Sequence, residues 1–157
     1  MDTQLIEEYE KGGVDLRMAV RGLEQEDLLA FPVPGTWSIQ QIVIHLLDTE
    51  LVLAERMKRV IAEENASLLE FDENKWIQKL SYEQQSVEDA VMLIETNRRN
   101  FARVLKSLPE EAFSRTGNHS KRGPMSVRDI LTMAVNHLKH HMKFIVNKRE
   151  MLGKMMW

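Results

Sequence analysis

Apolar residues recur every three or four positions along most of the chain, which is the spacing of helices with one buried face. Few stretches alternate between apolar and polar residues as strands do, and only seven Gly and four Pro interrupt the chain. The pattern therefore predicts an all-α protein. Its long helices are expected over residues 2 to about 29, 38 to about 64, 87 to 108 and 126 to 152.

The starts of these helices carry side chains that suit helix capping. Ser38 is followed three residues later by Gln41, which is the pattern of a capping box, where each side chain bonds the backbone N–H of the other residue. Ser86 and Ser126 are the N-cap candidates of the third and fourth helices. These serines predict where three of the four helices begin.

Two stretches break the helical pattern in the first half of the chain. Gly12 and Gly13 each cost a helix about 1 kcal/mol relative to Ala, so they predict a kink or a break. Residues 65–85 are the least regular, and Asp72 is expected to cap a short helix there. This segment either covers a pocket or lets Trp76 seal the end of the bundle, and the second interpretation is favoured slightly.

A third irregular stretch, residues 109–124, is predicted to form a polar loop because it contains two Gly and two Pro among polar residues. His119 lies within it and is expected to be solvated. The alternative is that the loop lies over the mouth of a pocket and brings His119 to a substrate.

A weak internal repeat relates the two halves of the chain. Residues 35–43 resemble residues 123–131, and each stretch leads from a loop into a capped helix. The repeat predicts two helical hairpins, residues 1–64 and 86–152, that form a four-helix bundle with pseudo-twofold symmetry. In such a bundle the second and fourth long helices are equivalent, and we expect them to pack side by side.

Composition narrows the class of protein. A chain of 157 residues with 43% hydrophobic and 29% charged residues predicts one globular domain, residues 1–157. A net charge of −3 without a basic concentration gives no reason to expect nucleic-acid binding. The chain has no Cys, which fits a reducing cytoplasm, and it has neither an apolar run long enough for a membrane span nor a signal-peptide pattern.

The histidines are the candidate chemistry. His137 and His141 fall on the apolar stripe of the last helix, one turn and about 6 Å apart, whereas His140 falls off it. His45 is the one polar residue in a turn of the second long helix, residues 42–47. Each histidine is either a core residue with local hydrogen bonds or a metal ligand, and the last helix alone favours neither.

A metal site needs at least three ligands, and the pair on the last helix supplies two. His45 would supply the third if the second and fourth long helices are neighbours. Three neutral imidazoles leave a metal its full charge and an open position, which is the catalytic arrangement. Asp48, Glu50 and Asp72 are candidates to orient the ligands or to act as bases, although each also fits an ordinary surface or capping role.

Arg56 lies on the same helix face as His45, three turns further along. An unpaired guanidinium would cost free energy if it were buried there. The more common outcome is that such an Arg extends its charged end to solvent or meets a surface carboxylate.

Three stretches together resemble the DinB/YfiT-like superfamily. They are the Trp-Ser-x6-His element that ends at His45, the later Phe71-Asp-x3-Trp76, and the His-x2-His-His motif, residues 137–141. The resemblance runs in order along nearly the whole chain. It implies an up-down-down-up four-helix bundle that is often dimeric, with zinc or nickel held by three histidines. By position these are His45, His137 and His141, and His140 matches a position that is usually not a ligand.

The resemblance also implies an activity. The superfamily contains metal-dependent hydrolases, which use water activated by the metal, and transferases that attach low-molecular-weight thiols such as bacillithiol to electrophiles. We expect a small-molecule substrate and a hydrolase, with the transferase as the alternative. Basic groups at the pocket mouth would favour a thiol, and Lys121 and Arg122 are the candidates.

A third interpretation is a non-catalytic dimeric interaction module. The apolar tail, residues 151–157, would then be buried in a partner or a dimer, or it folds back on its own bundle.

Overall fold

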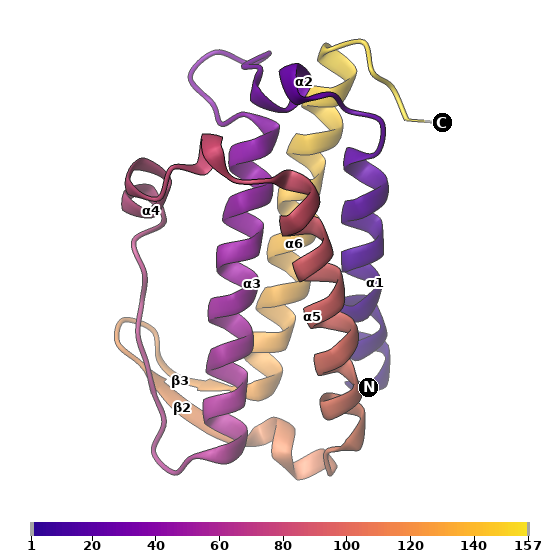
Figure 1. The fold of residues 1–157 in the computed structure, drawn as a ribbon. Helices are drawn as coiled ribbons and strands as arrows, with labels where there is room; N and C mark the ends of the chain where they lie inside the picture. Colours follow the sequence, from indigo (N-terminus) through magenta and orange to yellow (C-terminus); the bar gives the residue numbers. More distant parts are fainter. Residues whose placement is uncertain (1, 157) are drawn as a thin grey trace.

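The computed structural model describes residues 2–156. Within them, four long helices lie lengthwise beside one another (Figure 1): α1 (Asp2–Val20), α3 (Ile39–Ala62), α5 (Val87–Ser107) and α6 (Val127–Met151). Short elements connect them: α2 (Gln25–Leu29), β1 (Ser67–Leu68), α4 (Glu73–Lys79), the 3-10 helices η1 (Tyr82–Gln84) and η2 (Glu110–Ser114), and the strands β2 (Thr116–His119) and β3 (Gly123–Ser126).

The bundle has the up-down-down-up topology that the sequence led us to expect. In Figure 1, α1 and α6 rise while α3 and α5 descend. Helices α1 and α3 each pack against both α5 and α6, so α3 and α6 are neighbours as predicted. The two long helices of each predicted hairpin, α1 with α3 and α5 with α6, instead occupy diagonal corners, so the prediction of two packed hairpins is wrong. The connections are long enough to cross the bundle ends, whereas short loops would make consecutive helices neighbours.

Side-chain caps fix three of the four helix starts. Ser38 accepts a hydrogen bond from the backbone N–H of Gln41, whose side chain accepts one from the backbone of Ser38. Ser126 and Asp129 form the same reciprocal pair at the start of α6, and Ser86 caps α5. The predicted starts are confirmed.

Helix α1 runs without interruption through Gly12 and Gly13, so the predicted kink or break there is wrong. A Cβ at Gly13 would lie 2.7 Å from the Cα of Glu95, and one at Gly12 would lie 2.5 Å from Nη1 of Arg98. The two glycines therefore allow α1 to approach α5 closely. The helix ends at Val20, earlier than predicted, and the chain turns before α2.

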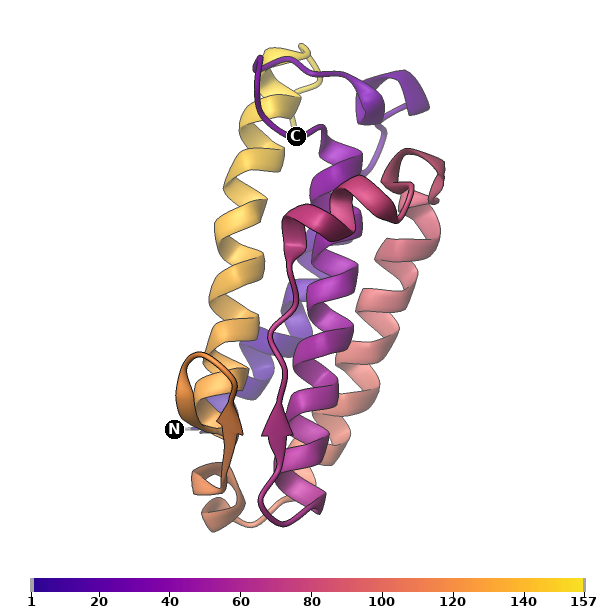
Figure 2. The same cartoon turned by 90° about the vertical axis from the view of Figure 1, so that its left-hand side faces the viewer.

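Residues 116–126 form two strands where a polar loop was predicted. β2 pairs with β3 in antiparallel register, and β1 pairs with β2 in parallel register. These strands are two to four residues long and lack a run of β-branched or aromatic residues, so they left no pattern to detect. Figure 2 shows the sheet and the segment that leads to α4 lying along the α3 and α6 side of the bundle.

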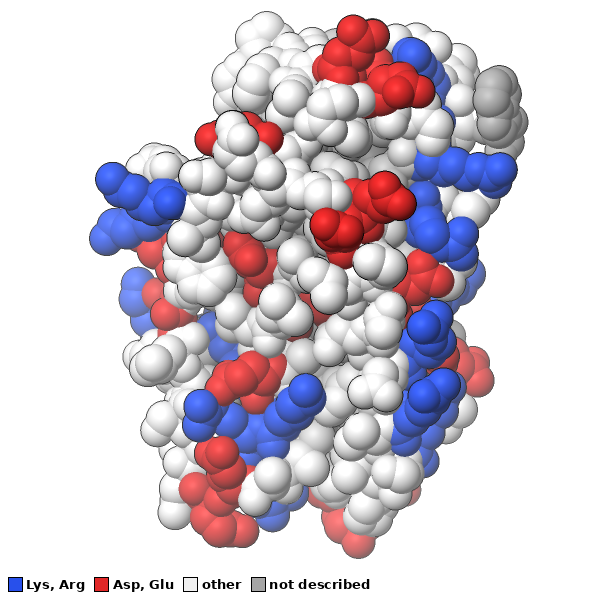
Figure 3. All heavy atoms as spheres, in the orientation of Figure 1, with Lys and Arg blue, Asp and Glu red and all other residues white. Residues whose placement is uncertain are grey.

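Two surface properties of the molecule bear on its partners. Acidic and basic side chains are both spread over the face that Figure 3 shows. No helix within residues 2–156 combines the length and the apolar character that a membrane span requires.

A buried polar network joins all four long helices between two apolar clusters. Nε of Arg98 donates to the Glu50 carboxylate at 2.7 Å, and the other guanidinium nitrogens donate to the backbone carbonyls of Tyr9 and Ala134 at 3.1 and 3.0 Å. Glu50 also accepts from Asn97 at 3.0 Å and from the Tyr9 hydroxyl. Glu50, which the sequence offered as a second-sphere candidate, is thus fully engaged in this network.

We expect Arg98→Met to destabilise the protein by about 3–5 kcal/mol, because it leaves the Glu50 carboxylate buried without its counter-charge. Urea unfolding of full-length variants measures this. Arg59→Met is the matched control: it removes exposed pairs with Glu55 and Glu63 and should cost far less stability, because water screens exposed charges. Adding Glu50→Gln to Arg98→Met should recover part of the loss. Equal destabilisation by Arg98→Met and Arg59→Met would contradict this account.

Candidate metal centre

Three histidines from two helices converge inside the bundle. One nitrogen from each of His45, His137 and His141 lies within 4.8 Å of the other two. Nε2 of His45 is 3.0 Å from Nε2 of His137, and the ring centroids are 4.9, 4.9 and 4.5 Å apart. His45 is fully buried and the other two are partly buried. The structure therefore brings together the three residues that the sequence selected.

The helix geometry explains this convergence. His137 and His141 are one turn apart on α6, so their side chains project from the same face. His45 lies on α3 within a turn whose residues 42–47 are all buried, and this turn packs against α6. The Trp37 ring packs edge-on to His45 at 5.0 Å and stacks on His141 at 6.1 Å, which limits the orientations of both rings.

Burial keeps all three imidazoles neutral at pH 7. Loss of solvation lowers the pKa of His45 and His141 to about 4 and that of His137 to about 3, and the neighbouring imidazoles add to the effect. Neutral rings hold a lone pair that is available to a cation.

The hydrogen bonding of the three rings is incomplete. Nδ1 of His45 and Nδ1 of His141 are buried without a hydrogen-bond partner among residues 2–156. Buried polar atoms are normally paired, so these two nitrogens favour a metal site over a role as core histidines with local hydrogen bonds. Converging neutral imidazoles are the donor set that zinc and other first-row divalent cations prefer. The residues present fit a divalent metal ion.

The sequence prediction missed Glu73. This residue is in the first turn of α4, and its Oε2 lies 3.6 Å from Nε2 of His45. Asp72, the predicted candidate, caps α4 instead by accepting from the backbone N–H of Lys75 at 3.1 Å, and its side chain is exposed. The sequence did contain a signal for Glu73. The prediction that Asp72 caps a short helix gave Asp72 a structural role, so Glu73 was the neighbouring carboxylate still available for the site.

Asp48 lies one turn after His45 on α3 and accepts a hydrogen bond from the Tyr82 hydroxyl. Burial raises the pKa of its carboxyl group. Asp48 is not among the groups that converge with the three histidines. Its contact instead ties η1, which follows α4, to the face of α3 that carries His45.

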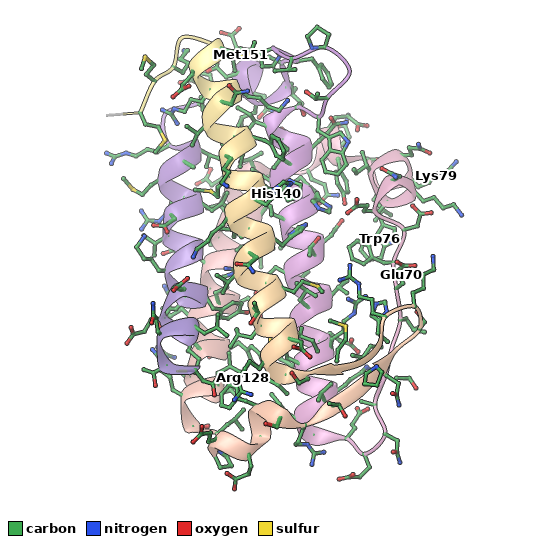
Figure 4. The ribbon with its side chains drawn as sticks, turned by 180° about the vertical axis from the view of Figure 1, so that it is seen from behind. Glu70, Trp76, Lys79, Arg128, His140 and Met151 are labelled. Carbon is green, nitrogen blue, oxygen red and sulfur yellow. The ribbon has the colours of Figure 1, made fainter. Side chains whose placement is uncertain are left out.

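The two remaining histidines differ from each other. His119 is 5% exposed, and its Nδ1 accepts from the backbone N–H groups of Lys121 and Arg122, each at 3.1 Å. The prediction of a solvated His119 is wrong because the turn between β2 and β3 folds over the ring. His140 is exposed on the outer side of α6, as its helix position predicted (Figure 4).

Two cavities reach the histidine cluster. A polar cleft of about 510 Å³ touches His137 and is lined by Thr49, Arg56 and His119, among others. A more apolar pocket of about 420 Å³ touches His141 and is lined by Trp37, Ile42 and Phe144.

The segment before α4 forms one wall of the polar cleft. Phe71 lines the cleft, and Trp76 packs on it with ring centroids 4.7 Å apart. Figure 4 shows Trp76 beside the bundle rather than at its end. The alternative in which this segment covers a pocket is therefore the one that the structure adopts.

Comparison with known proteins connects the site to a family. The model of the DinB superfamily matches residues 8–145. A protein of Oceanobacillus iheyensis named "Putative metal-dependent hydrolase" is 28% identical over 132 residues, which are 84% of this chain and 76% of that protein. A Bacillus cereus protein of the same name is 26% identical over 148 residues, which are 94% and 85% of the two chains.

Among solved structures, YfiT from Bacillus subtilis is similar, with a TM-score of 0.89 and 22% identity over 96% of this chain and 87% of that one. It is described as "a probable metal-dependent hydrolase with an unusual four-helix bundle topology". At this identity the likeness establishes the fold.

We expect the metal-free protein to lose stability as the pH falls from about 6.5 to about 4. Unfolded imidazoles have a pKa near 6.5, whereas the folded ones have pKa values of about 3 to 4. In this window the unfolded state binds more protons, so the free energy of unfolding decreases with decreasing pH. Urea unfolding across the window measures the slope.

Matched variants assign this slope to the buried rings. His45→Gln should make the slope shallower, and His140→Gln should leave it unchanged because that ring is exposed. An unchanged slope in His45→Gln would contradict the assignment.

Proposed function

This chain belongs to the DinB superfamily, and from that premise we propose that it is an enzyme that hydrolyses a small molecule with a divalent metal ion held by His45, His137 and His141. The observation that carries the proposal is the convergence of three neutral imidazoles beside two cavities. The names of the relatives from Oceanobacillus iheyensis and Bacillus cereus support hydrolysis as the reaction.

The metal would supply the electrophilic part of the chemistry. In a site with three protein ligands, a divalent ion lowers the pKa of water and polarises a carbonyl or phosphoryl oxygen. The all-nitrogen donor set is suited to zinc or nickel, and we propose one of these two.

Glu73 is our candidate for the general base. Its carboxylate lies 3.6 Å from the nearest histidine nitrogen, so it reaches the place where a water and a substrate would meet. A carboxylate there accepts the proton of the attacking water and returns it to the leaving group. Asp72 supports Glu73 by capping α4, and Asp48 supports it by holding Tyr82 close to the same segment.

We further propose a cytoplasmic homodimer in which residues 1–157 form one domain. The absence of Cys supports the compartment. Exposed Phe31, Phe144 and Met155 supply apolar surface that a second copy would cover. Part of the tail folds back, because Lys154 pairs with Asp27 at 3.5 Å, whereas Trp157 lies outside the described residues.

Transfer of a low-molecular-weight thiol to an electrophile is the second candidate function. The observation that favours it is the presence of Arg56, Lys121 and Arg122 along the polar cleft. Since the chain has no Cys, the nucleophile would be the thiol of the substrate, with a proton passing to Glu73. A non-catalytic interaction module is the third candidate and predicts no turnover.

We expect Glu73→Gln to lower kcat by roughly 10²–10⁴-fold while the metal content stays unchanged, because the variant removes a proton acceptor and no histidine. Untagged protein loaded with zinc or nickel is assayed against esters, amides and phosphoesters, and separately against thiols paired with electrophiles. The panel that shows turnover assigns the reaction.

Glu88→Gln is the control variant because Glu88 is an exposed residue at the start of α5. It should retain full activity. Turnover by Glu73→Gln at the wild-type rate would contradict the role of Glu73 as general base. No turnover of either group of substrates would contradict both enzyme proposals and favour the non-catalytic interaction module.

A further inference from the structure

The polar cleft contains a buried positive charge that has no carboxylate partner. Arg56 is 5% exposed and lines the cleft together with His137. One guanidinium nitrogen, Nη2, donates to the backbone carbonyl of Leu69, while Nε is buried without a partner. Within residues 2–156, Arg56 takes part in no ion pair, so the sequence expectation that it reaches solvent or a surface carboxylate is wrong.

Such an arrangement is costly unless something else offsets it. A buried guanidinium needs an opposite charge or a full set of acceptors, and one neutral carbonyl provides neither. The hydroxyl of Thr49, on the same helix and in the same cleft, is also buried without a hydrogen-bond partner in the described chain. Two residues with unsatisfied polar groups therefore line one cavity.

Further donors line the same end of the cleft. Nδ1 of His119 accepts two backbone N–H groups, so the neutral ring carries its proton on Nε2, which is a donor. Arg122 lines the cleft and, like Arg56, forms no ion pair among residues 2–156. Lys121 differs because Glu70 offsets its charge at 2.7 Å.

Among the described residues, no carboxylate of the cleft forms an ion pair with Arg56 or Arg122, and Glu70 acts on both only at longer range. Glu70 is engaged by Lys121, and Asp72 caps α4. Glu73 lies at the histidine cluster instead. The cleft is thus polarised, with unpaired positive charge at the Arg56 end and a carboxylate at the histidine end.

We propose that the Arg56 end of the cleft is a subsite for an anionic group of the substrate, either a carboxylate or a phosphate, and that Arg56 determines this specificity. This proposal rests on the proposed function, which places the reacting bond of the substrate at the three histidines. A planar guanidinium with free donors matches the oxygens of either anion.

The position of Arg56 also restricts the shape of the substrate. Arg56 follows His45 by eleven residues, which is about 16 Å along the axis of α3. The anionic group therefore lies several bonds away from the bond that reacts. Compact substrates without a charged extension would leave the subsite empty.

The test is a titration of metal-free, full-length protein with inorganic phosphate and, separately, with acetate at constant ionic strength. Removing the metal ensures that neither anion binds to it. The backbone amide signals of Lys121 and Arg122 in NMR spectra report binding at this end of the cleft. We expect saturable shifts with at least one anion, and the tighter one assigns the chemical class.

Three variants locate the binding. Arg56→Met should weaken it at least tenfold, Arg56→Lys should give an intermediate loss, and Arg59→Met, an exposed arginine on the same helix, should not change it. Arg56→Lys keeps the charge, so it preserves the test if Arg56→Met does not fold. Absence of saturable shifts with both anions, or equal affinity in both Arg56 variants and the wild type, would overturn the proposal.

The subsite and the proposed function fail in different ways. Arg56-dependent anion binding without turnover of any substrate would support the subsite while the hydrolase proposal fails. Turnover by the metal-loaded protein without Arg56-dependent binding would overturn the subsite and leave the hydrolase proposal in place.

Discussion

The ion pair between Arg98 and Glu50 is the constraint on which the rest of the structure depends. It lies in the centre of the bundle and joins all four long helices through the backbone carbonyls of Tyr9 and Ala134. Because buried polar groups tolerate few alternative pairings, this network sets how far α3 and α6 can slide past each other. The register that it fixes is the one that brings His45 opposite His137.

The Arg98–Glu50 network and the proposed metal centre both bury polar side chains, and they offset the cost of that burial in different ways. Arg98 and Glu50 satisfy each other, so the core around them closes. The three imidazoles avoid charge through burial, which lowers their pKa values, but they leave two nitrogens unpaired. Unpaired groups continue through Thr49 and Arg56 into the polar cleft. The unpaired polar atoms of the described chain thus belong either to the proposed metal ligands His45 and His141 or to Thr49 and Arg56, which line the cleft with the proposed anion subsite.

Much of this arrangement was predictable from local patterns. Ser38 and Ser126 marked helix starts through their capping partners, and the spacing of His137 and His141 placed both on a buried face. What the sequence did not reveal depends on contacts between distant segments. The burial of His119 comes from strands too short to leave a pattern, and the position of Glu73 depends on how an irregular segment crosses α3. The diagonal placement of α1 relative to α3, and of α5 relative to α6, reflects long connections that no periodicity encodes.

The account is tested most directly by the metal content per chain of untagged protein supplied with zinc or nickel, measured by elemental analysis. It predicts close to one metal ion per wild-type chain, loss of that ion in His45→Ala and in His137→Ala, and retention in His140→Ala. Loss in both of the first two variants would mean that residues of two different helices share one site. A wild type that binds no metal, or variants that retain it, would contradict the account.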